Sequence, residues 1–526
     1  MMLKGTDEIY DFVIIGSGFG GSVSALRLSE KGYKVLVIEK GKWYTNKDFP
    51  KTNWNLKKWL WLPSLKFHGI LKLTFFRHVS ILSGVGVGGG SLVYANTLPR
   101  PKTNFYTNGN WAGLADWESE LKPHYATAEK MLGANKNPKF FDADLSLKKV
   151  ADKLGKGAEF EAPNVAVYFG KPNEEVDDPY FEGKGPRRSG CQFCGQCMTG
   201  CPHNAKNTLD KNYLYLAQNL GAEIFAEKLV TTVELNTSNE SHYIISYQNS
   251  TSFFKKDKKS IKTNGIIFSG GVLGTVRLLL DMKTKKLLPH LSDQIGNFIR
   301  TNNENLALVT TKDKTLDMSK GIAIGSIFPP NEDGHIEAVR YGSGSNFWKL
   351  PMVPMVFGKT VFSRVFQILK EWLLHPIDSL GIYFKKDFAN KTVILLFMQH
   401  LDSTIKFKRG LFNLKSKVST GLKPTPFIPM AKILTDKVAA EINGKPFMMN
   451  TDILLGSPST AHILGGAVIG KDSKSGVIDT NQKVFDYDNM YVCDGAAVSA
   501  NPGVNPSLTI TAMTERVMSK IPAKNN

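Results

Sequence analysis

Four of the five cysteines stand close together, and their spacing suits metal chemistry. They form the pattern Cys191-x2-Cys194-x2-Cys197-x3-Cys201, followed by a proline. Ferredoxins ligate iron–sulfur clusters at this spacing, although their fourth cysteine serves a different cluster. Only Cys493 remains elsewhere in the chain. Two interpretations therefore stay open for Cys191, Cys194, Cys197 and Cys201: ligands of an iron–sulfur cluster, or structural thiols of a packed turn.

A glycine-rich turn near the N-terminus predicts a phosphate-binding site. The apolar run 12–15 leads into Gly16-Ser-Gly18-Phe-Gly-Gly21, and a helical pattern follows at 23–28. Gly16 permits the turn, Gly18 lets the backbone approach a pyrophosphate, and Gly21 lets the helix pack on the strand. The amide end of the helix then faces the phosphates.

These residues need two parallel strands to position them. The second apolar strand, 34–38, ends in Glu39, where an acid accepts ribose hydroxyls and disfavours a 2′-phosphate. We therefore predict an α/β Rossmann-like domain that binds FAD or NAD. At 526 residues and 42% hydrophobic composition the chain is long enough for a second domain.

Three further blocks give the chain a family resemblance. They are Gly84-Val-Gly-Val-Gly-Gly-Gly-Ser-Leu-Val-Tyr94-Ala-Asn96, Ile266–Leu278 with its Gly270-Gly271 turn, and Tyr491–Thr511. With the first turn, they resemble the glucose-methanol-choline (GMC) oxidoreductases over almost the whole chain, and most closely the cholesterol oxidase-like branch. The resemblance implies FAD and a second, α+β domain built on an antiparallel sheet.

The same resemblance implies the contacts to FAD. Small residues let the backbone approach the flavin, and an Asn-Pro pair opens a helix whose amides face the pyrimidine. Beyond the first turn, the implied cofactor residues are Gly86, Gly89, Gly90, Ser91, Asn96, Val230, Asp494, Gly495, Asn505 and Pro506. Asn96 takes the place of an asparagine that relatives carry where this chain has Tyr94.

The resemblance also places the reacting pair at His462 and Asn505. Oxidation of an alcohol by hydride transfer needs a group that takes the hydroxyl proton and another that fixes the oxygen, and His and Asn suit these roles. Similar cholesterol oxidases carry proline after this histidine, whereas this chain has Ile463.

Steroid isomerisation is not supported by the sequence. Cholesterol oxidases use a glutamate just before a strand that we expect at 392–398. No glutamate lies between Glu371 and Glu441, and Asp387 is the nearest carboxylate upstream.

The expected domains are discontinuous. The FAD-binding domain takes 1–50, 80–110, 205–310 and 455–526. The substrate-binding domain, an antiparallel sheet over the flavin with helices behind it, takes 111–204 and 311–454. The segment 51–79 is a lid or a membrane contact.

The net charge of +19 gathers in aromatic segments. Lys51 to Lys102 holds eight basic and no acidic residues among Trp54, Trp59, Trp61 and three phenylalanines. A second segment, Phe347 to Phe388, repeats Val361, Val365, Ile368 and Trp372 at helical spacing beside basic residues. Such segments suit either a helix at an anionic membrane surface or an ordinary amphipathic helix over the core. No nucleic-acid motif accompanies the charge.

No signal peptide and no spanning segment are recognisable, so we expect a cytoplasmic protein that is either free or peripheral on the inner face of the membrane. The expected function is FAD-dependent oxidation of a sterol-like or long-chain alcohol, with oxygen or a redox partner accepting the electrons. Two alternatives are a flavin-dependent reductase of a lipid double bond and a non-catalytic lipid-binding flavoprotein.

Overall fold

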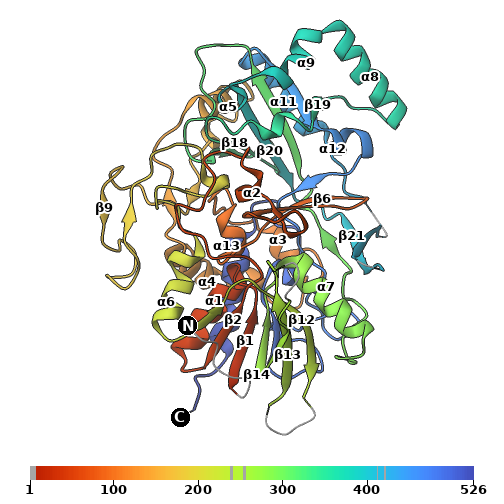
Figure 1. Cartoon of the computed structure of the whole chain (residues 1–526). Coiled ribbons are helices and arrows are strands. Elements are labelled where there is room, and N and C mark those ends of the chain that lie inside the picture. Colours follow the sequence, from red (N-terminus) through yellow and green to blue (C-terminus); the bar gives the residue numbers. More distant parts are fainter. Residues whose placement is uncertain (1–7, 237–240, 253–255, 412, 420–421, 526) are drawn as a thin grey trace.

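The chain is built from two sheets with a layer of helices against each. The computed structural model describes residues 8–236, 241–252, 256–411, 413–419 and 422–525. In Figure 1 a mainly parallel sheet occupies the lower half, where both termini lie, and an antiparallel sheet occupies the upper half. Among the described residues, no helix is long and apolar enough to cross a membrane.

The first sheet has the predicted Rossmann-like order. It runs β11 (Glu223–Phe225), β2 (Val35–Ile38), β1 (Ile9–Ile15), β14 (Lys259–Phe268), β13 (Tyr243–Asn249) and β12 (Lys228–Leu235), with β25 (Met490–Val492) also on β14. The strands β11, β2, β1, β14 and β25 pair in parallel, whereas β12 and β13 are antiparallel. Residues 12–15 are all apolar and buried, as expected of a strand covered on both faces.

Three helices of this half follow β1, β14 and β25 in the chain. They are α1 (Phe19–Glu30), α7 (Gly271–Thr284) and α13 (Ser507–Lys520). Parallel strands deliver such helix N-termini to one edge of the sheet, which is where α/β proteins bind their ligands.

The second sheet is antiparallel, as predicted. Its order is β17 (Ile324–Phe328), β18 (Gly334–Val339), β20 (Thr392–Gln399), β16 (Asn305–Thr311), β23 (Gly444–Met449) and β19 (Met352–Pro354). Strand β20 alternates: Val393, Leu395 and Phe397 pack in the cluster of α5 (Asp142–Lys153) and α11 (Pro429–Glu441), whereas Ile394 and Leu396 line a cavity on the other face. The period of two thus separates core from cavity.

The division of the chain between the halves differs in detail from the expected ranges. Helix α4 (Trp117–Met131) packs against α13, where the Tyr125 hydroxyl lies 2.9 Å from Thr509 Oγ1. It therefore belongs to the core of the Rossmann-like half. Conversely, β16 places residues 305–310 in the antiparallel sheet.

The basic aromatic segment 51–79 is partly internal and partly exposed. Its helix α2 (Leu56–Trp59) has only four residues, and β3 (Trp61–Leu62), β4 (Phe67–His68) and β5 (Leu71–Phe75) follow it. Trp59 is fully buried, and Trp61 and Leu71 line the cavity. Part of the segment therefore walls the cavity, and its only helix has four residues. Contact of its exposed residues, such as Trp54 and Phe75, with a membrane stays a prediction.

Candidate active site

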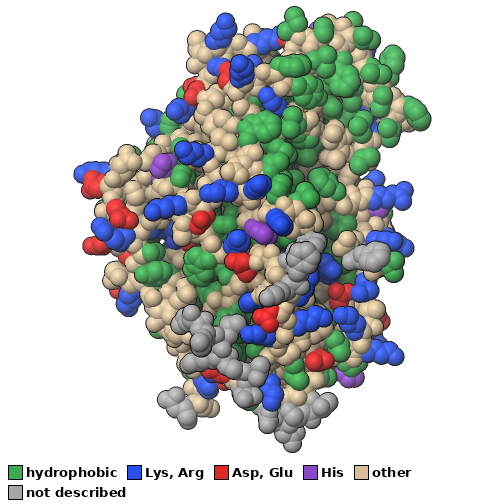
Figure 2. All heavy atoms as spheres, in the orientation of Figure 1, with side chains coloured by type: hydrophobic (Ala, Val, Ile, Leu, Met, Phe, Trp, Pro, Cys, Tyr) green, Lys and Arg blue, Asp and Glu red, His purple; other side chains and the backbone are tan. Residues whose placement is uncertain are grey.

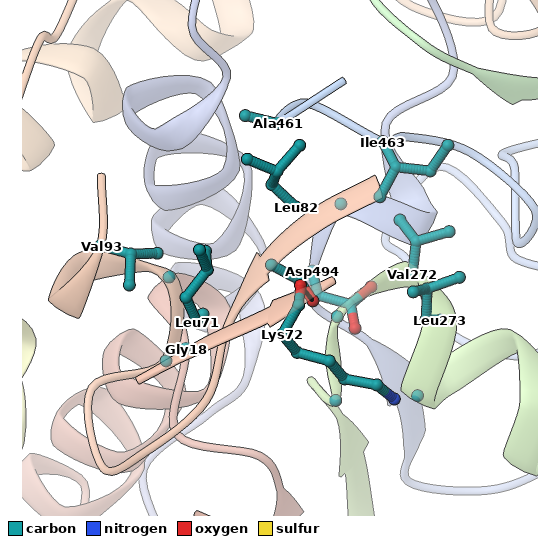
Figure 3. A pocket seen from close by; sticks show the side chains of 18 of the residues that line it. Gly18, Leu71, Lys72, Leu82, Val93, Val272, Leu273, Ala461, Ile463 and Asp494 are labelled. Atoms are coloured by element: carbon teal, nitrogen blue, oxygen red, sulfur yellow. Dashed lines mark hydrogen bonds between the residues drawn. The ribbon is translucent and has the colours of Figure 1, made fainter. Parts of the chain in front are cut away.

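A cavity of about 880 Å³ extends between the two sheets. Its walls come from the glycine turn of the Rossmann-like half, from β5 and β6 (Ser80–Gly84), and from the apolar face of the antiparallel sheet. In Figure 3, Leu71 and Lys72 on β5, Leu82 on β6 and Val272 on α7 surround Asp494. Cavities of this size accommodate cofactors and small molecules.

The glycine turn leaves open space along this cavity. A Cβ at Gly18 would meet nothing nearer than 4.0 Å, and at Gly271 and Gly274 nothing lies within 4 Å. Gly16 has φ 103°, and a Cβ on Gly21 would lie 2.0 Å from the Gly16 carbonyl oxygen. Gly16 and Gly21 therefore shape the turn, while Gly18 leaves room for a ligand.

Glu39 closes the turn from the adjacent strand end. Its carboxylate accepts hydrogen bonds from the Ser17 amide at 3.1 Å, the Ser17 hydroxyl at 2.9 Å and the Gly41 amide at 2.8 Å. These bonds hold the carboxylate at the cavity wall, where it is placed to accept ribose hydroxyls.

Three cations on the cavity wall were not recognised in the sequence. Lys40, Lys72 and Arg277 all line it. Burial, together with the charges of Lys40 and Arg277, lowers the pKa of Lys72 to about 8. A group of mutually repelling cations fits a pyrophosphate, which would neutralise them. In the sequence Lys72 is noticeable only as part of the acid-free stretch, which suits a lid, a membrane contact or an ordinary amphipathic helix.

The flavin end is marked by Asp494. Its carboxylate accepts a hydrogen bond from the Thr275 hydroxyl at 2.6 Å and from the Ala496 amide at 2.8 Å. Burial raises its pKa to about 6. With the open glycines and the cations, this acceptor makes the cavity fit FAD, whose ribityl hydroxyls would donate to it.

Most of the expected site residues line the cavity, and four do not. Those that line it are Gly16, Gly18, Glu39, Gly89, Gly90, Val230, His462, Asp494, Gly495, Asn505 and Pro506. Gly21 packs inside the turn, and the Gly86 carbonyl accepts from the Ser17 hydroxyl at 3.2 Å. The Ser91 hydroxyl bonds Gly88 and Leu209, and Asn96 is fully buried with φ 70°. These four support the turns behind the cavity.

His462 and Asn505 meet at the apolar end. Asn505 Nδ2 lies 3.5 Å from His462 Nε2, and both residues face the cavity. The side-chain amide oxygen of Asn505, Oδ1, is buried and has no hydrogen-bond partner among the described residues. An unpaired buried acceptor beside an imidazole nitrogen is placed to take a hydroxyl group.

Two buried glutamates that sequence analysis missed hold this pair. Glu304 Oε1 lies 2.9 Å from His462 Nδ1, and Asn505 Nδ2 donates to Glu337 Oε2 at 3.3 Å. Burial lowers the pKa of His462, but the charge and hydrogen bond of Glu304, with the charge of Glu337, outweigh it and raise this pKa above its usual value. Glu337 lies on β18, outside the range searched for a glutamate; Asp387 is exposed and does not line the cavity.

The cysteine run is a packed turn of thiols. Among the described residues, which include all four cysteines, no group of three or more histidine, cysteine or acidic side chains has a metal-binding arrangement. Burial raises the pKa of Cys191 far above its usual range and that of Cys194 to about 12, and Cys191, Cys197 and Cys201 pack in one apolar cluster. The expected iron–sulfur ligation is therefore not supported.

Comparison with known proteins agrees with the fold and gives the family. Residues 14–50 match the NAD(P)-binding Rossmann-like domain, and residues 429–514 match the GMC oxidoreductase family. A cholesterol oxidase of Acinetobacter baumannii is 46% identical, with 98% of this chain and 95% of that protein covered. One of Mycobacterium tuberculosis (strain ATCC 25618 / H37Rv) is 43% identical over 98% and 91%. The crystal structure of pyridoxine 4-oxidase from Mesorbium loti has the same fold, with a TM-score of 0.59 at 14% identity over 97% and 99% of the two chains.

A Rossmann-like half, a dinucleotide cavity and a buried His-Asn pair define an oxidoreductase that acts on CH–OH groups. With relatives this similar over nearly its full length, the chain belongs to the GMC oxidoreductases.

The open position of Gly18 allows a test of FAD binding. Gly18→Val should leave a folded but colourless protein, because the side chain would fill the space for the pyrophosphate. Lost hydrogen bonds to a charged group contribute about 1.5–3 kcal/mol each, so two of them predict an affinity lower by more than about 100-fold. Flavin absorbance after gel filtration measures this. Gly381→Val, at an equally open glycine away from the cavity, should stay yellow; a yellow Gly18→Val protein would disprove the placement.

Proposed function

We propose that this protein oxidises a sterol-like or long-chain alcohol to the carbonyl compound with FAD as its cofactor. The proposal rests on one observation: His462 Nε2 and the side-chain amide of Asn505, whose Oδ1 is unpaired, meet at the apolar end of a cavity that fits FAD. The flavin, when bound, supplies the hydride acceptor.

His462 would take the hydroxyl proton. In the neutral imidazole that donates Nδ1–H to Glu304, the Nε2 lone pair faces the cavity 3.5 Å from Asn505 Nδ2, where it would accept the proton of a bound alcohol. As the O–H proton passes to Nε2, the hydrogen on the carbinol carbon would leave with the C–H electron pair, as hydride, for the acceptor. The C–O bond then becomes the C=O double bond. Asn505 would hold the oxygen so that the C–H lies over the acceptor.

The walls favour a hydrophobic alcohol. Leu306, Leu308, Leu396 and Ile394 line the cavity beside aliphatic and aromatic side chains of the other half. The two relatives above are cholesterol oxidases, which supports a sterol. A polar alcohol would leave these walls unmatched and gain little from burial.

The other two functions considered from the sequence have less support. A reductase fed through the cysteine run would need a redox centre there, and those thiols have no metal-binding arrangement. A non-catalytic lipid-binding protein would not require a histidine such as His462 at the cavity wall. Since such alcohols reside in bilayers, we propose that the enzyme works at an anionic membrane surface.

Anaerobic mixing of the FAD-loaded protein with sterols, long-chain alcohols and short alcohols tests the proposal. Bleaching of the flavin by the hydrophobic alcohols alone is the expected result. Readmission of oxygen then decides the acceptor: fast recovery of the yellow colour indicates an oxidase, and slow recovery indicates a redox partner. If none of the alcohols bleaches the flavin, alcohol oxidation is wrong.

A second activity is favoured by Glu337. Its carboxylate is fully buried, bonds Asn505 at 3.3 Å and lies 2.9 Å from His335 Nε2. Glu337 does not itself line the cavity but lies directly behind Asn505, which does. A carboxylate that reaches the new ketone would remove a proton from the adjacent carbon and return it further along, which would move a steroid double bond into conjugation. We therefore propose isomerisation after oxidation, with Glu337 in the role for which sequence analysis found no glutamate.

Glu337→Gln tests this second step. Conjugated enone formation should fall by about 10²- to 10⁴-fold, the usual contribution of an acid–base group. Oxidation should fall by no more than about tenfold, since one hydrogen bond to Asn505 weakens. Ultraviolet absorbance follows the enone and flavin absorbance follows oxidation. Equal enone formation by both proteins would exclude Glu337 as the base.

A further inference from the structure

Two consecutive helices carry an exposed apolar surface that the catalytic site does not use. Helix α8 (Val361–Leu374) and helix α9 (Pro376–Phe384) lie at the end of the molecule remote from the termini (Figure 1). Their exposed apolar side chains are Val361, Phe362, Val365, Phe366, Leu369, Leu373, Leu374, Ile377, Leu380 and Phe384. Phe362 is 89% exposed, Ile377 86% and Phe384 83%. Figure 2 shows hydrophobic side chains gathered over this end.

Sequence analysis noted a different set of residues in this segment, Val361, Val365, Ile368 and Trp372. Of the four residues noted there, Ile368 is buried and Trp372 packs in the cluster of Met448 and Ile453. These two anchor α8 to the protein. The outward face is instead formed by Phe362, Phe366, Leu369 and Leu373, which recur at the spacing of one helix face.

The two helices are fixed to the fold in spite of their exposure. The buried Arg364 guanidinium donates to the Ile453 carbonyl at 2.5 Å and to the Gly358 carbonyl at 2.7 Å. The Ser379 hydroxyl donates to the Glu371 carbonyl at 3.1 Å and joins α9 to α8. The exposed side chains are therefore held in place, and their exposure is not caused by local unfolding.

The charge around this surface is positive. Lys359, Lys370 and Lys386 are exposed. The acids of the two helices are already paired, Glu371 with Lys445 at 2.6 Å and Asp378 with Lys312 at 2.7 Å. A projecting apolar face bordered by free lysines complements a bilayer that contains anionic lipid, into which the aromatic and aliphatic groups insert while the ammonium groups stay at the headgroups.

The surface also adjoins the cavity. Ile382 of α9 packs in one cluster with Trp348, Met352 and Met449, and these three residues line the cavity. Helix α9 therefore packs directly against the outer side of the apolar cavity wall.

We propose that α8 and α9 form a membrane-docking hairpin that inserts into anionic bilayers and delivers the hydrophobic alcohol to the cavity. The delivery rests on the proposed function, whereas the docking does not. A projecting face of side chains suits a fluid bilayer better than a protein partner, which would have to offer a matching groove.

The test uses the FAD-loaded protein and vesicles of phosphatidylcholine with or without phosphatidylglycerol. Wild type should co-sediment with the mixed vesicles, less with phosphatidylcholine alone, and less in high salt, because salt screens the lysines. Phe362→Asp/Ile377→Asp should weaken binding by more than about 100-fold, since burying each apolar side chain contributes about tenfold or more. Leu220→Asp/Leu145→Asp, at exposed leucines of other elements, is the matched control and should bind as wild type does.

Activity separates docking from chemistry. The hairpin variant should oxidise a detergent-dissolved alcohol at the wild-type rate but lose activity on the same alcohol in vesicles. If no alcohol is oxidised by any variant, the proposed function fails while vesicle binding still decides docking. Equal vesicle binding by the hairpin variant and wild type would overturn the proposal. A wild-type dimer that the hairpin variant converts to monomers, without vesicle binding, would overturn it in favour of a second copy of the chain.

Discussion

His462→Ala is expected to slow reduction of the flavin by alcohol about 10²- to 10⁴-fold, the range typical of a general base. The side chain faces the cavity with Nε2 beside Asn505, so its removal leaves the hydroxyl proton without an acceptor. The loss should shrink at high pH, where the alcohol ionises more readily. Anaerobic stopped-flow measurement of flavin bleaching gives the rate at each pH.

Asn505→Ala provides the comparison. It removes a hydrogen bond that positions oxygen and no base, so its rate should fall with a weaker dependence on pH. Both proteins should remain yellow and folded. If His462→Ala reduces its flavin as fast as wild type, the histidine is structural and the proposed mechanism is wrong.

Glu304→Gln is expected to produce the second large effect, about 100-fold at neutral pH. Glu304 lies 2.9 Å from His462 Nδ1 and selects the tautomer whose Nε2 accepts a proton. The amide has no charge and can donate to Nδ1, which would leave Nε2 protonated. Loss of a comparable charged partner in a serine protease costs about 10⁴-fold through the wrong tautomer.

The pH profile distinguishes a positioning residue from a merely structural one. Glu304 and Glu337 raise the pKa of His462, so the histidine of the wild type becomes a base only above that raised value. In Glu304→Gln the pKa falls, and the rising limb of the rate profile should move to lower pH although the rate is smaller. Nitrogen chemical shifts of the His462 ring report the same pKa without turnover.

Asp452→Asn is the matched control for this variant. Asp452 is also a buried carboxylate, bonded to the Ser459 hydroxyl at 2.7 Å, but it does not line the cavity. Asp452→Asn should leave the rising limb of the pH–rate profile at the same pH as in the wild type. An unchanged profile in Glu304→Gln would show that Glu304 supports only the fold.

Local patterns predicted much of the fold and part of the site. The strand 12–15, the glycine turn and Glu39 lie close together in the sequence. The backbone conformation of the strand and of the turn follows from short-range sterics and burial. The His462 and Asn505 assignments came from motif blocks, and the structure brings both residues to one end of the cavity. Their catalytic roles remain predictions.

Charge and aromatic content misled the prediction where long-range packing decides. Lys72 and Trp61 belong to a stretch with no acid, which resembles a membrane contact, yet both line the cavity. The spacing of apolar residues in 361–372 predicted a helix correctly. It did not predict which face packs on the protein: Ile368 is buried, and Phe362 is exposed. Composition records which residues a segment holds and carries no information about which face meets the rest of the chain.

The sequence by itself determined the Rossmann-like turn and the family and predicted His462 and Asn505 as the reacting pair, because each depends on residues that are adjacent or stand in recognisable blocks. Only the tertiary structure decided the partners of that pair. Glu304 follows a strand of 299–300, and Glu337 lies on β18; neither belongs to the block of His462 or of Asn505. The antiparallel sheet brings them there through strand register, and their burial gives their charges the strength to fix the tautomer and pKa of the histidine.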